Sequence, residues 1–186
     1  MSSDLKIRAI VAVAVASLAI IIYIAIAFRK VPRPASSWRF GVCAVAALIH
    51  DLLFVIGVFA ILGHFFGYEI NSLFITALLT IMGFSVHDTI VVFDRIRENI
   101  IKNPQKSLAD NAEISINQTI ARSLNTSLTA ILVLVSMLIL GGSTIRPFTL
   151  MLAMGIGIGT YSSIFVASPI LVTYYEYINR RSKRSK

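Results

Sequence analysis

The stretch GFSVHDTIVVFDRIRENI at residues 83–100 joins a long apolar run to a dense cluster of charges. His87 and Asp88 lie inside the apolar run, with apolar residues on both sides. A run of about 20 apolar residues is the length that an α-helix needs to cross about 30 Å of hydrocarbon. The stretch therefore predicts a membrane helix that carries a carboxylate within it and reaches the membrane surface near Asp94.

The whole chain has the composition of a membrane protein. Of its 186 residues, 56% are hydrophobic and only 14% are charged, which is too much apolar surface for a soluble domain of this size. The apolar runs are too long and continuous for the alternating strands of a membrane barrel. We therefore predict an all-α, polytopic membrane helix bundle that forms a single domain over residues 1–186. Its five transmembrane helices are expected at about 7–28, 39–62, 71–93, 124–140 and 148–175, with a cytoplasmic helix at about 104–121 that lies along the interface or leads into the fourth helix.

The basic residues are distributed unevenly among the connecting segments. Of the 17 Lys and Arg residues, 14 belong to the segments around 29–39 and 95–122 and to the C-terminal tail RRSKRSK. Only Lys6, Arg8 and Arg146 belong to the other side. The positive-inside rule then predicts an N-terminus outside the cell and a C-terminus in the cytoplasm. An outer N-terminus without an export signal suggests a further segment before Met1, and the first helix is expected to be retained because its apolar run exceeds that of a signal peptide.

Ionisable residues inside the predicted helices are the candidates for function, because a charge at the bilayer centre costs about 2.5–3.5 kcal/mol on insertion scales. Asp88 is predicted to relay or respond to protons, since a membrane-buried carboxylate can gain and lose a proton. Arg122 begins the antiparallel fourth helix at the same membrane surface, and its flexible stem is expected to reach Asp88, which lies about 9 Å deep. His87, beside Asp88, and the pair His50 and Asp51 in the second helix are further candidates.

Each candidate also has a structural interpretation. Arg122 could be an interfacial arginine that snorkels to water, and Asp51 could serve only its neighbour His50. Hydroxyl residues that recur on one helical face are expected mainly to hold helices together. In the third helix these residues are Ser72, Thr76 and Thr80, on the same face as Gly83 and His87. In the fourth helix they are Thr126, Thr129 and Ser136, on the same face as Asn125. In the fifth helix, small residues at four-residue spacing are expected to allow close packing: Gly155, Gly159 and Ser163.

The sequence lacks the patterns of an enzyme. It contains no nucleophile–base set, no cluster with metal-ligand spacing and no phosphate-binding glycine loop, so no catalytic residue, metal or cofactor is expected. Protons are the expected coupling ion. The net charge of +8 is assigned to the cytoplasmic loops rather than to nucleic-acid binding, and the lipid bilayer is the expected surrounding.

The motif HDTIVVFDRIREN at 87–99 resembles the SecF family of protein-export membrane subunits. INQTIARSLNTSLTAI at 116–131 and IHD at 49–51 agree with this family, and the similarity covers nearly the whole chain as the last five membrane helices of SecF. The resemblance implies half of an RND-type transmembrane domain in the bacterial plasma membrane. It implies an accessory subunit that works with SecD beside the SecYEG channel and couples proton flow to late-stage translocation of secreted proteins.

The resemblance also implies roles for particular residues. Asp88 would be the proton-responsive carboxylate, and Arg122 its charged neighbour. The signature at the cytoplasmic edge would be structural rather than proton-carrying: Asp94, Arg95, Arg97, Glu98 and Asn99.

The sequence departs from the family in two respects. The family has one more helix and an external domain before these five helices, so a fragment and a natural split protein are both open. His87 stands where many relatives carry Asn, and a titratable neighbour would alter the proton affinity of Asp88. Two other functions also stay open. One is half of an RND-type proton-coupled exporter of small molecules or lipids, and the other is a non-conducting assembly scaffold of the translocon. The cargo, stoichiometry and order of steps do not follow from the sequence.

Overall fold

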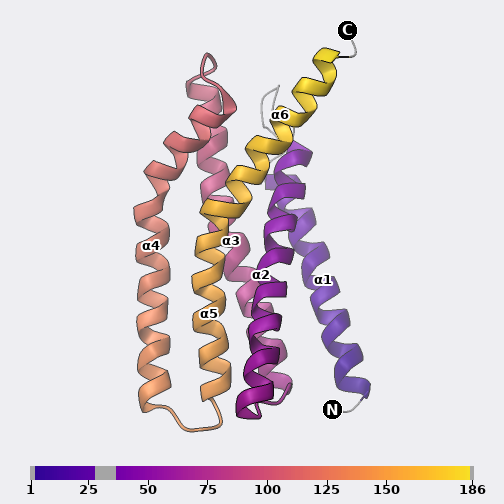
Figure 1. Ribbon diagram of the computed structural model, residues 1–186, viewed down its shortest axis with the longest axis vertical. Coiled ribbons are helices and arrows are strands. Elements are labelled where there is room, and N and C mark those ends of the chain that lie inside the picture. The colour runs from indigo at the N-terminus through magenta and orange to yellow at the C-terminus, as the bar shows by residue number, and fades with distance from the viewer. Residues whose placement is uncertain (1–2, 28–36, 185–186) are drawn as a thin grey trace.

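The computed structural model describes residues 3–27 and 37–184, and these residues form helices joined by short turns. The elements are α1 (Ser3–Ala27), α2 (Ser37–Phe66), α3 (Ser72–Lys102), α4 (Leu108–Leu140), α5 (Arg146–Ser162), a π-helical turn η1 (Ser163–Ala167) and α6 (Ser168–Arg184). Because α5, η1 and α6 follow without a break, the described chain makes five helical rods, which lie side by side (Figure 1). The predicted all-α fold with five helices is confirmed.

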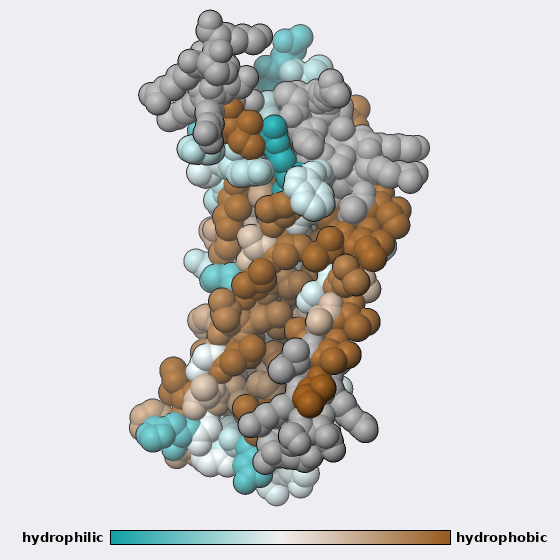
Figure 2. Space-filling view, turned by 90° about the vertical axis from the view of Figure 1, so that its right-hand side faces the viewer, coloured by the Kyte–Doolittle hydropathy of each residue, from teal (hydrophilic) through white to brown (hydrophobic). Residues whose placement is uncertain are grey.

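The rods have the dimensions of a multi-pass membrane protein. Four are long and apolar enough to cross a membrane: Trp38–Phe66, Ser72–Lys102, Leu108–Leu140 and Arg146–Ile178. A shorter apolar helix, Val11–Ile24, lies within α1. Apolar side chains cover the middle of the face shown in Figure 2, and polar side chains gather towards its ends. The N- and C-terminal ends lie at opposite ends of the bundle (Figure 1).

Local sequence signals explain where the helices end. Gly67 follows α2 with φ +69°, a left-handed conformation that glycine adopts without strain, and its N–H bonds to the carbonyl of Gly63. Asn71 caps α3 by accepting from the N–H of Phe74 at 3.1 Å. At the start of α4, Ser107 and Asp110 satisfy each other's backbone N–H groups in a capping box.

The third and fourth helices extend well beyond their predicted bounds. The third helix continues past residue 93 to Lys102, so the charged signature lies on its last turns. Of the two alternatives for the helix at about 104–121, the structure agrees with the one in which it leads into the fourth helix, because α4 begins at Leu108 and runs without interruption to Leu140. The stretch has a strong N-terminal cap and contains no Pro or Gly that would break it. The predictions for Phe28, Arg29, Lys30, Arg33 and Lys186 lie outside the described residues.

The fifth rod bends where α5 passes into α6. Pro169 has no N–H, and its ring would collide with the carbonyl four residues earlier in a regular α-helix. The π-helical turn that precedes it widens the helix there, and the Ser168 hydroxyl donates to the carbonyl of Ser163 at 3.0 Å. Pro169 therefore kinks the rod rather than ending it, and α6 leans away from the axis of α5 (Figure 1).

The helices pack around α3. Towards the C-terminal end of the bundle, Phe40 of α2 and Phe93 of α3 meet edge to face with centroids 5.3 Å apart. Both belong to one buried cluster that also contains Ile24 of α1 and Leu171 of α6. A second cluster joins α2, α3 and α5 towards the other end, around Val55, Ile81 and Met151. Asp51 lies between the residues of these two clusters along α2, and Ser162 and Ser163 lie between them along the fifth rod.

Candidate functional site

Asp51 is a carboxylate with no exposed surface in the middle of α2. Its Oδ2 accepts hydrogen bonds from the hydroxyls of Ser85 on α3, at 2.5 Å, and Ser162 on α5, at 2.7 Å. Its Oδ1 lies 3.0 Å from Nδ1 of His50, whose ring is partly exposed. Asp51 therefore ties α2 to both α3 and α5, and this tie goes well beyond satisfying His50.

Asp88 on α3 makes the corresponding tie to α4 and to the π-helical turn. Only 7% of its surface is exposed. Its Oδ1 accepts from the hydroxyl of Ser123 on α4 at 2.6 Å, and its Oδ2 accepts from the hydroxyl of Ser163 at 2.5 Å. Hydrogen bonds to a charged group contribute about 1.5–3 kcal/mol each, so these two bonds offset part of the cost of burying the carboxylate.

Hydroxyl partners suit a carboxyl group that changes its charge. A hydroxyl both donates and accepts, so the same serines can donate to an ionised carboxylate or accept from a protonated one. Ser163 has a second acceptor within reach, the carbonyl of Thr160 at 2.9 Å, to which its hydrogen can turn. A lysine or arginine partner would instead be left as an unpaired buried cation when the acid is protonated. The arrangement around Asp88 can therefore satisfy both protonation states.

The predicted contact between Asp88 and Arg122 is not formed in this structure. Both oxygens of Asp88 are occupied by serines, and the side chain of Arg122 is exposed. One residue along a helix is a rotation of about 100°, and it is Ser123 rather than Arg122 that faces α3. His87 is displaced from Asp88 in the same way and is exposed, so it does not contact the carboxylate through this face.

The polar faces predicted on the third and fourth helices lie on the outside of the chain. Thr76, Thr80, Thr129 and Ser136 are exposed, and each hydroxyl donates to a carbonyl of its own helix four residues earlier. They do not join helices within this chain, which corrects the sequence-based expectation. Ser72, Gly83, Asn125 and Thr126 are exposed as well.

The inward face of α4 carries a different set of polar residues at four-residue spacing. These buried residues were not singled out from the sequence: Asn111, Ser115, Thr119, Ser123 and Ser127. On α3 the inward positions include Ser85, Asp88, Val92, Ile96 and Asn99, spaced by three or four residues. Counting this spacing outward from Asp88 would have found Ser85 and Asn99.

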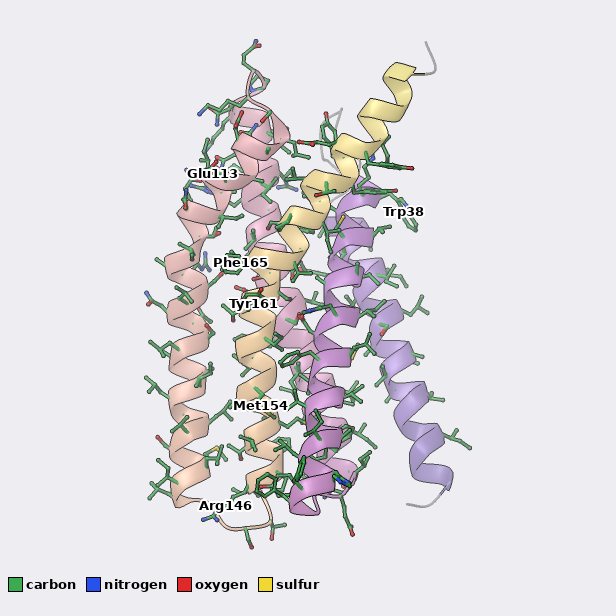
Figure 3. The ribbon with its side chains drawn as sticks, in the orientation of Figure 1. Trp38, Glu113, Arg146, Met154, Tyr161 and Phe165 are labelled. Atoms are coloured by element: carbon green, nitrogen blue, oxygen red, sulfur yellow. The ribbon has the colours of Figure 1, made fainter. Side chains whose placement is uncertain are left out.

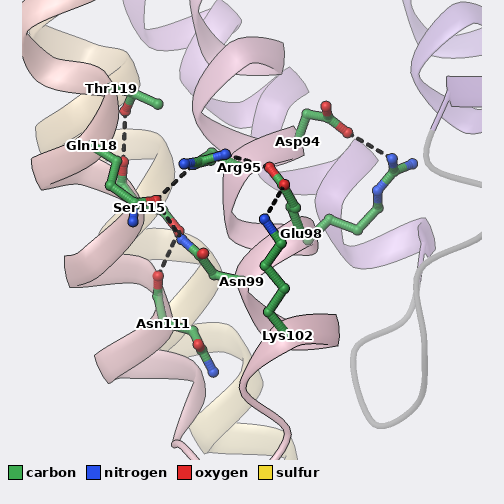
Figure 4. Close-up of polar contacts among 10 residues, drawn as sticks. Asp94, Arg95, Glu98, Asn99, Lys102, Asn111, Ser115, Gln118 and Thr119 are labelled. Carbon is green, nitrogen blue, oxygen red and sulfur yellow. Dashed lines mark hydrogen bonds and ion pairs between the residues drawn. The ribbon is translucent and has the colours of Figure 1, made fainter.

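The signature residues form a polar junction between the ends of α3 and α4 (Figure 4). Asn99 is buried and donates to Ser115 Oγ at 2.7 Å and to Gln118 Oε1 at 3.0 Å. Arg95 also donates to Gln118 at 2.6 Å, and it pairs with Glu98. Glu98 pairs with Lys102 as well. The hydrogen bond from Lys102, and to a smaller extent the one from Arg95, lowers the pKa of this surface carboxyl.

Asp94 and Arg97 complete the signature, and both are less buried than Asn99. Asp94 and Arg97 form an ion pair across one helical turn at 2.9 Å, and the side chain of Asp94 is 58% exposed. Arg97 also donates to the carbonyl of Ala27 at 3.4 Å, which places α3 against the end of α1. Of the five, Arg95 and Asn99 therefore join α3 to α4, and of these two Asn99 is the buried one.

The small residues of α5 lie against α3. A Cβ atom on Gly155 would overlap the side chain of Ile81, and one on Gly159 would come within 3.1 Å of Ser85 Cβ. This close approach brings Ser162 and Ser163, which follow on the same helix, to the carboxylates. The exposed side of the fifth rod is apolar here. Tyr161 and Phe165 lie on it and stack with their ring centroids 5.1 Å apart (Figure 3).

Residues 3–27 and 37–184 contain no group of three or more His, Cys, Asp or Glu side chains placed to hold a metal ion. The buried hydrogen-bonded groups described above form a polar centre of two carboxylates and four serines: Asp51, Asp88, Ser85, Ser123, Ser162 and Ser163. Such a centre can bind protons and rearrange hydrogen bonds.

Residues 1–177 match the family model described as "Protein export membrane protein SecD/SecF, C-terminal". The chain belongs to this family. It is 55% identical over 171 residues to the protein translocase subunit SecF of Thermobaculum terrenum, an alignment that covers 92% of this chain and 53% of the relative. It is 48% identical over 168 residues to SecF of Anaerolinea thermophila, covering 90% of this chain and 54% of the relative. The resemblance to SecF found in the sequence is confirmed.

The fold of a solved family structure is also similar. The crystal structure described as SecDF in super-membrane-facing form has a TM-score of 0.86 and 37% sequence identity, and covers 100% of this chain and 24% of that one. The chain spans about half the length of the curated SecF relatives named above.

Proposed function

We propose that this chain is the membrane bundle of a SecF-type accessory subunit of the bacterial Sec translocase, and that it couples proton movement to the late steps of protein export. The names of its relatives, which are translocase subunits, support the first part. The observation that carries the second part is the pair of serine hydroxyls bound to Asp88. Ser123 and Ser163 can form hydrogen bonds with either protonation state of this carboxyl.

In the proposed cycle, the charge of Asp88 controls how firmly α3 holds its neighbours. The ionised carboxylate accepts two charge-assisted hydrogen bonds, which are roughly twice as strong as neutral ones. After protonation, the new O–H donates to a serine oxygen, and Ser163 turns its own hydrogen to the carbonyl of Thr160. The tie between α3 and the π-helical turn is then weaker, and the packing equilibrium of the bundle shifts.

The partner that this proposal requires is SecD, the other half of an RND-type transmembrane domain. Exposed polar residues on α3 and α4, among them Thr80, His87, Arg122 and Asn125, are poorly suited to lipid. Helices of a partner would cover them and satisfy their polar groups. The likeness to SecDF supports SecD as that partner, and SecYEG and secreted proteins complete the proposed machinery.

The proposed orientation has the N-terminus outside and the C-terminus in the cytoplasm of a plasma membrane. Arg95, Lys102 and Lys106 lie at the same end of the bundle as the C-terminus, where the connection from α3 to α4 also lies (Figure 1). Their charge supports placing this end in the cytoplasm.

The test is export into membrane vesicles, with and without a proton gradient, at matched levels of the subunit. Asp88→Asn keeps the size and, like the protonated acid, offers one acceptor and one donor group, but it cannot titrate, so we expect it to assemble and to lose the stimulation by the gradient. Asp94→Asn, six residues further along α3, is the matched control because this carboxylate is exposed, and it should retain the stimulation. Full stimulation with Asp88→Asn would reject the coupling role. If export still required the subunit in that case, a scaffold would be the better description.

A further inference from the structure

Ser162 and Ser163 are consecutive residues, but their hydroxyls bind different carboxylates. Ser162 donates to Asp51 Oδ2 at 2.7 Å, and Ser163 donates to Asp88 Oδ2 at 2.5 Å. Both serines have no exposed surface. They lie where α5 ends and the π-helical turn begins, so one short junction is tied to two acids on two different helices.

The helix α3 is also tied to both acids. Ser85 donates to Asp51 at 2.5 Å, and Asp88 itself lies three residues further along on the same face. The helix α3 and the serine junction, Ser162 and Ser163, are therefore connected twice. Ser85 and Ser162 both bind Asp51, and Asp88 binds Ser163 directly. A movement of the serine junction relative to α3 that changes the hydrogen bonds at Asp51 therefore also changes the hydrogen bond between Ser163 and Asp88.

We propose that Asp51 is a second proton-binding carboxyl and that Ser162 and Ser163 couple its protonation to that of Asp88. This inference rests on the proposed function of Asp88 and extends it to a pair of sites. The step at each site is a proton transfer from hydronium, in which one O–H bond of hydronium breaks, one O–H bond forms on a carboxylate oxygen, and a water molecule is left. Each serine then has a carbonyl of the preceding turn as its other acceptor, Gly159 at 3.4 Å for Ser162 and Thr160 at 2.9 Å for Ser163.

The surroundings of the two acids contain few other charges. His50 lies beside Asp51 on α2, and His87 lies beside Asp88 on α3 but is exposed. From α4, Arg122 is the neighbour of Ser123 and is exposed. The fifth rod, which packs against both acids, has no Asp, Glu, Lys, Arg or His between Arg146 and Glu176. The serine junction is the more direct of the two described connections between Asp51 and Asp88, because Ser162 and Ser163 are consecutive, whereas Ser85 lies three residues before Asp88 on α3.

Infrared difference spectroscopy of the complete complex in bilayers measures this coupling directly. The carboxyl band that disappears in Asp88→Asn reports Asp88, and its midpoint is followed against pH. In Asp51→Asn we expect the midpoint to move by about tenfold in proton concentration, the size at which two sites titrate as a pair. Because coupling is reciprocal, the Asp51 band should move by a similar factor in Asp88→Asn, and this second measurement is decisive if Asp51→Asn does not fold.

The role of the serine junction is tested by repeating the comparison in a Ser162→Ala background, where the effect of Asp51→Asn on the Asp88 midpoint should largely disappear. Ser127→Ala is the matched control, because Ser127 is buried and donates only to carbonyls of its own helix, so the effect should persist there. Midpoints that do not respond to the other acid would reject the coupling. Coupling that survives Ser162→Ala would reject the serine route. Either result leaves the export assay of Asp88→Asn, and thus the proposed function, to be judged by itself.

Discussion

Ser163 Oγ donates to Asp88 Oδ2 over 2.5 Å and thereby joins the π-helical turn of the fifth rod to the middle of α3. Ser123 holds the other oxygen of the same carboxylate from α4. Three helical rods thus meet at a single acid that is 93% shielded from solvent, since only 7% of its surface is exposed. A change of charge at this point acts on all three rods at once.

Loss of the Ser123 hydroxyl should weaken this meeting point. Ser123→Ala leaves one oxygen of a buried carboxylate without its donor, which costs about 1–3 kcal/mol. We expect a lower unfolding temperature of the complex in detergent and a smaller stimulation of export by the proton gradient. Ser127→Ala, four residues further along the same face, should change neither by as much. Equal losses for the two variants would show that Ser123 acts only through helix packing.

The contact between α5 and α3 predicts a size limit at Gly155. Gly155→Ala places a Cβ against Ile81, which is fully buried and has little room to move, and over-packing of this kind costs about 1–3 kcal/mol. Gly157→Ala is the matched control, because its Cβ would be 4.0 Å from Ile131, an ordinary contact distance. Unfolding in detergent measures both variants. Ile81→Val removes one of the overlapping atoms and should restore part of the loss in Gly155→Ala. A neutral Gly155→Ala would contradict the close packing.

Within the signature, Asn99 should matter more for stability than Asp94. Asn99→Ala removes two hydrogen bonds to α4 and leaves the buried Ser115 with fewer partners, so a loss of about 1–3 kcal/mol is expected. Asp94→Asn breaks an exposed ion pair within one helix, which contributes about 0.3–0.5 kcal/mol. Thermal unfolding of the two variants, side by side, decides the order. The reverse order would mean that Asp94 has a partner outside this chain.

The proposed orientation can be measured with single cysteines in a background where Cys43 is replaced by Ala. Gln105 lies in the exposed connection between α3 and α4, and Ser143 lies in the exposed turn between α4 and α5. We expect Gln105→Cys to react with an impermeant reagent only from the cytoplasmic side and Ser143→Cys only from outside. Labelling with the sides exchanged would overturn the orientation, and with it the direction of proton entry.

The sequence by itself determined the number of helices, the membrane character and the family. These follow from long apolar runs, from the concentration of charge outside those runs and from the motif at 87–99, all of which are local along the chain. It also identified Asp51 and Asp88, because a carboxylate in an apolar run is costly wherever the helix is placed.

Only the tertiary structure decided which side of each helix faces inward. Amphipathic patterns are weak in a membrane helix, since both lipid-facing and buried residues are apolar, and polar residues occur on two faces of α3 and α4. The sequence favoured the faces of His87 and Arg122, but the bundle turns Asp88 and Ser123 inward, and each of these is rotated by about 100° from its neighbour. The pairing of Ser162 with Asp51 and of Ser163 with Asp88 joins residues 111 and 75 positions apart, and it depends on the close approach of α5 to α3 that Gly155 and Gly159 allow.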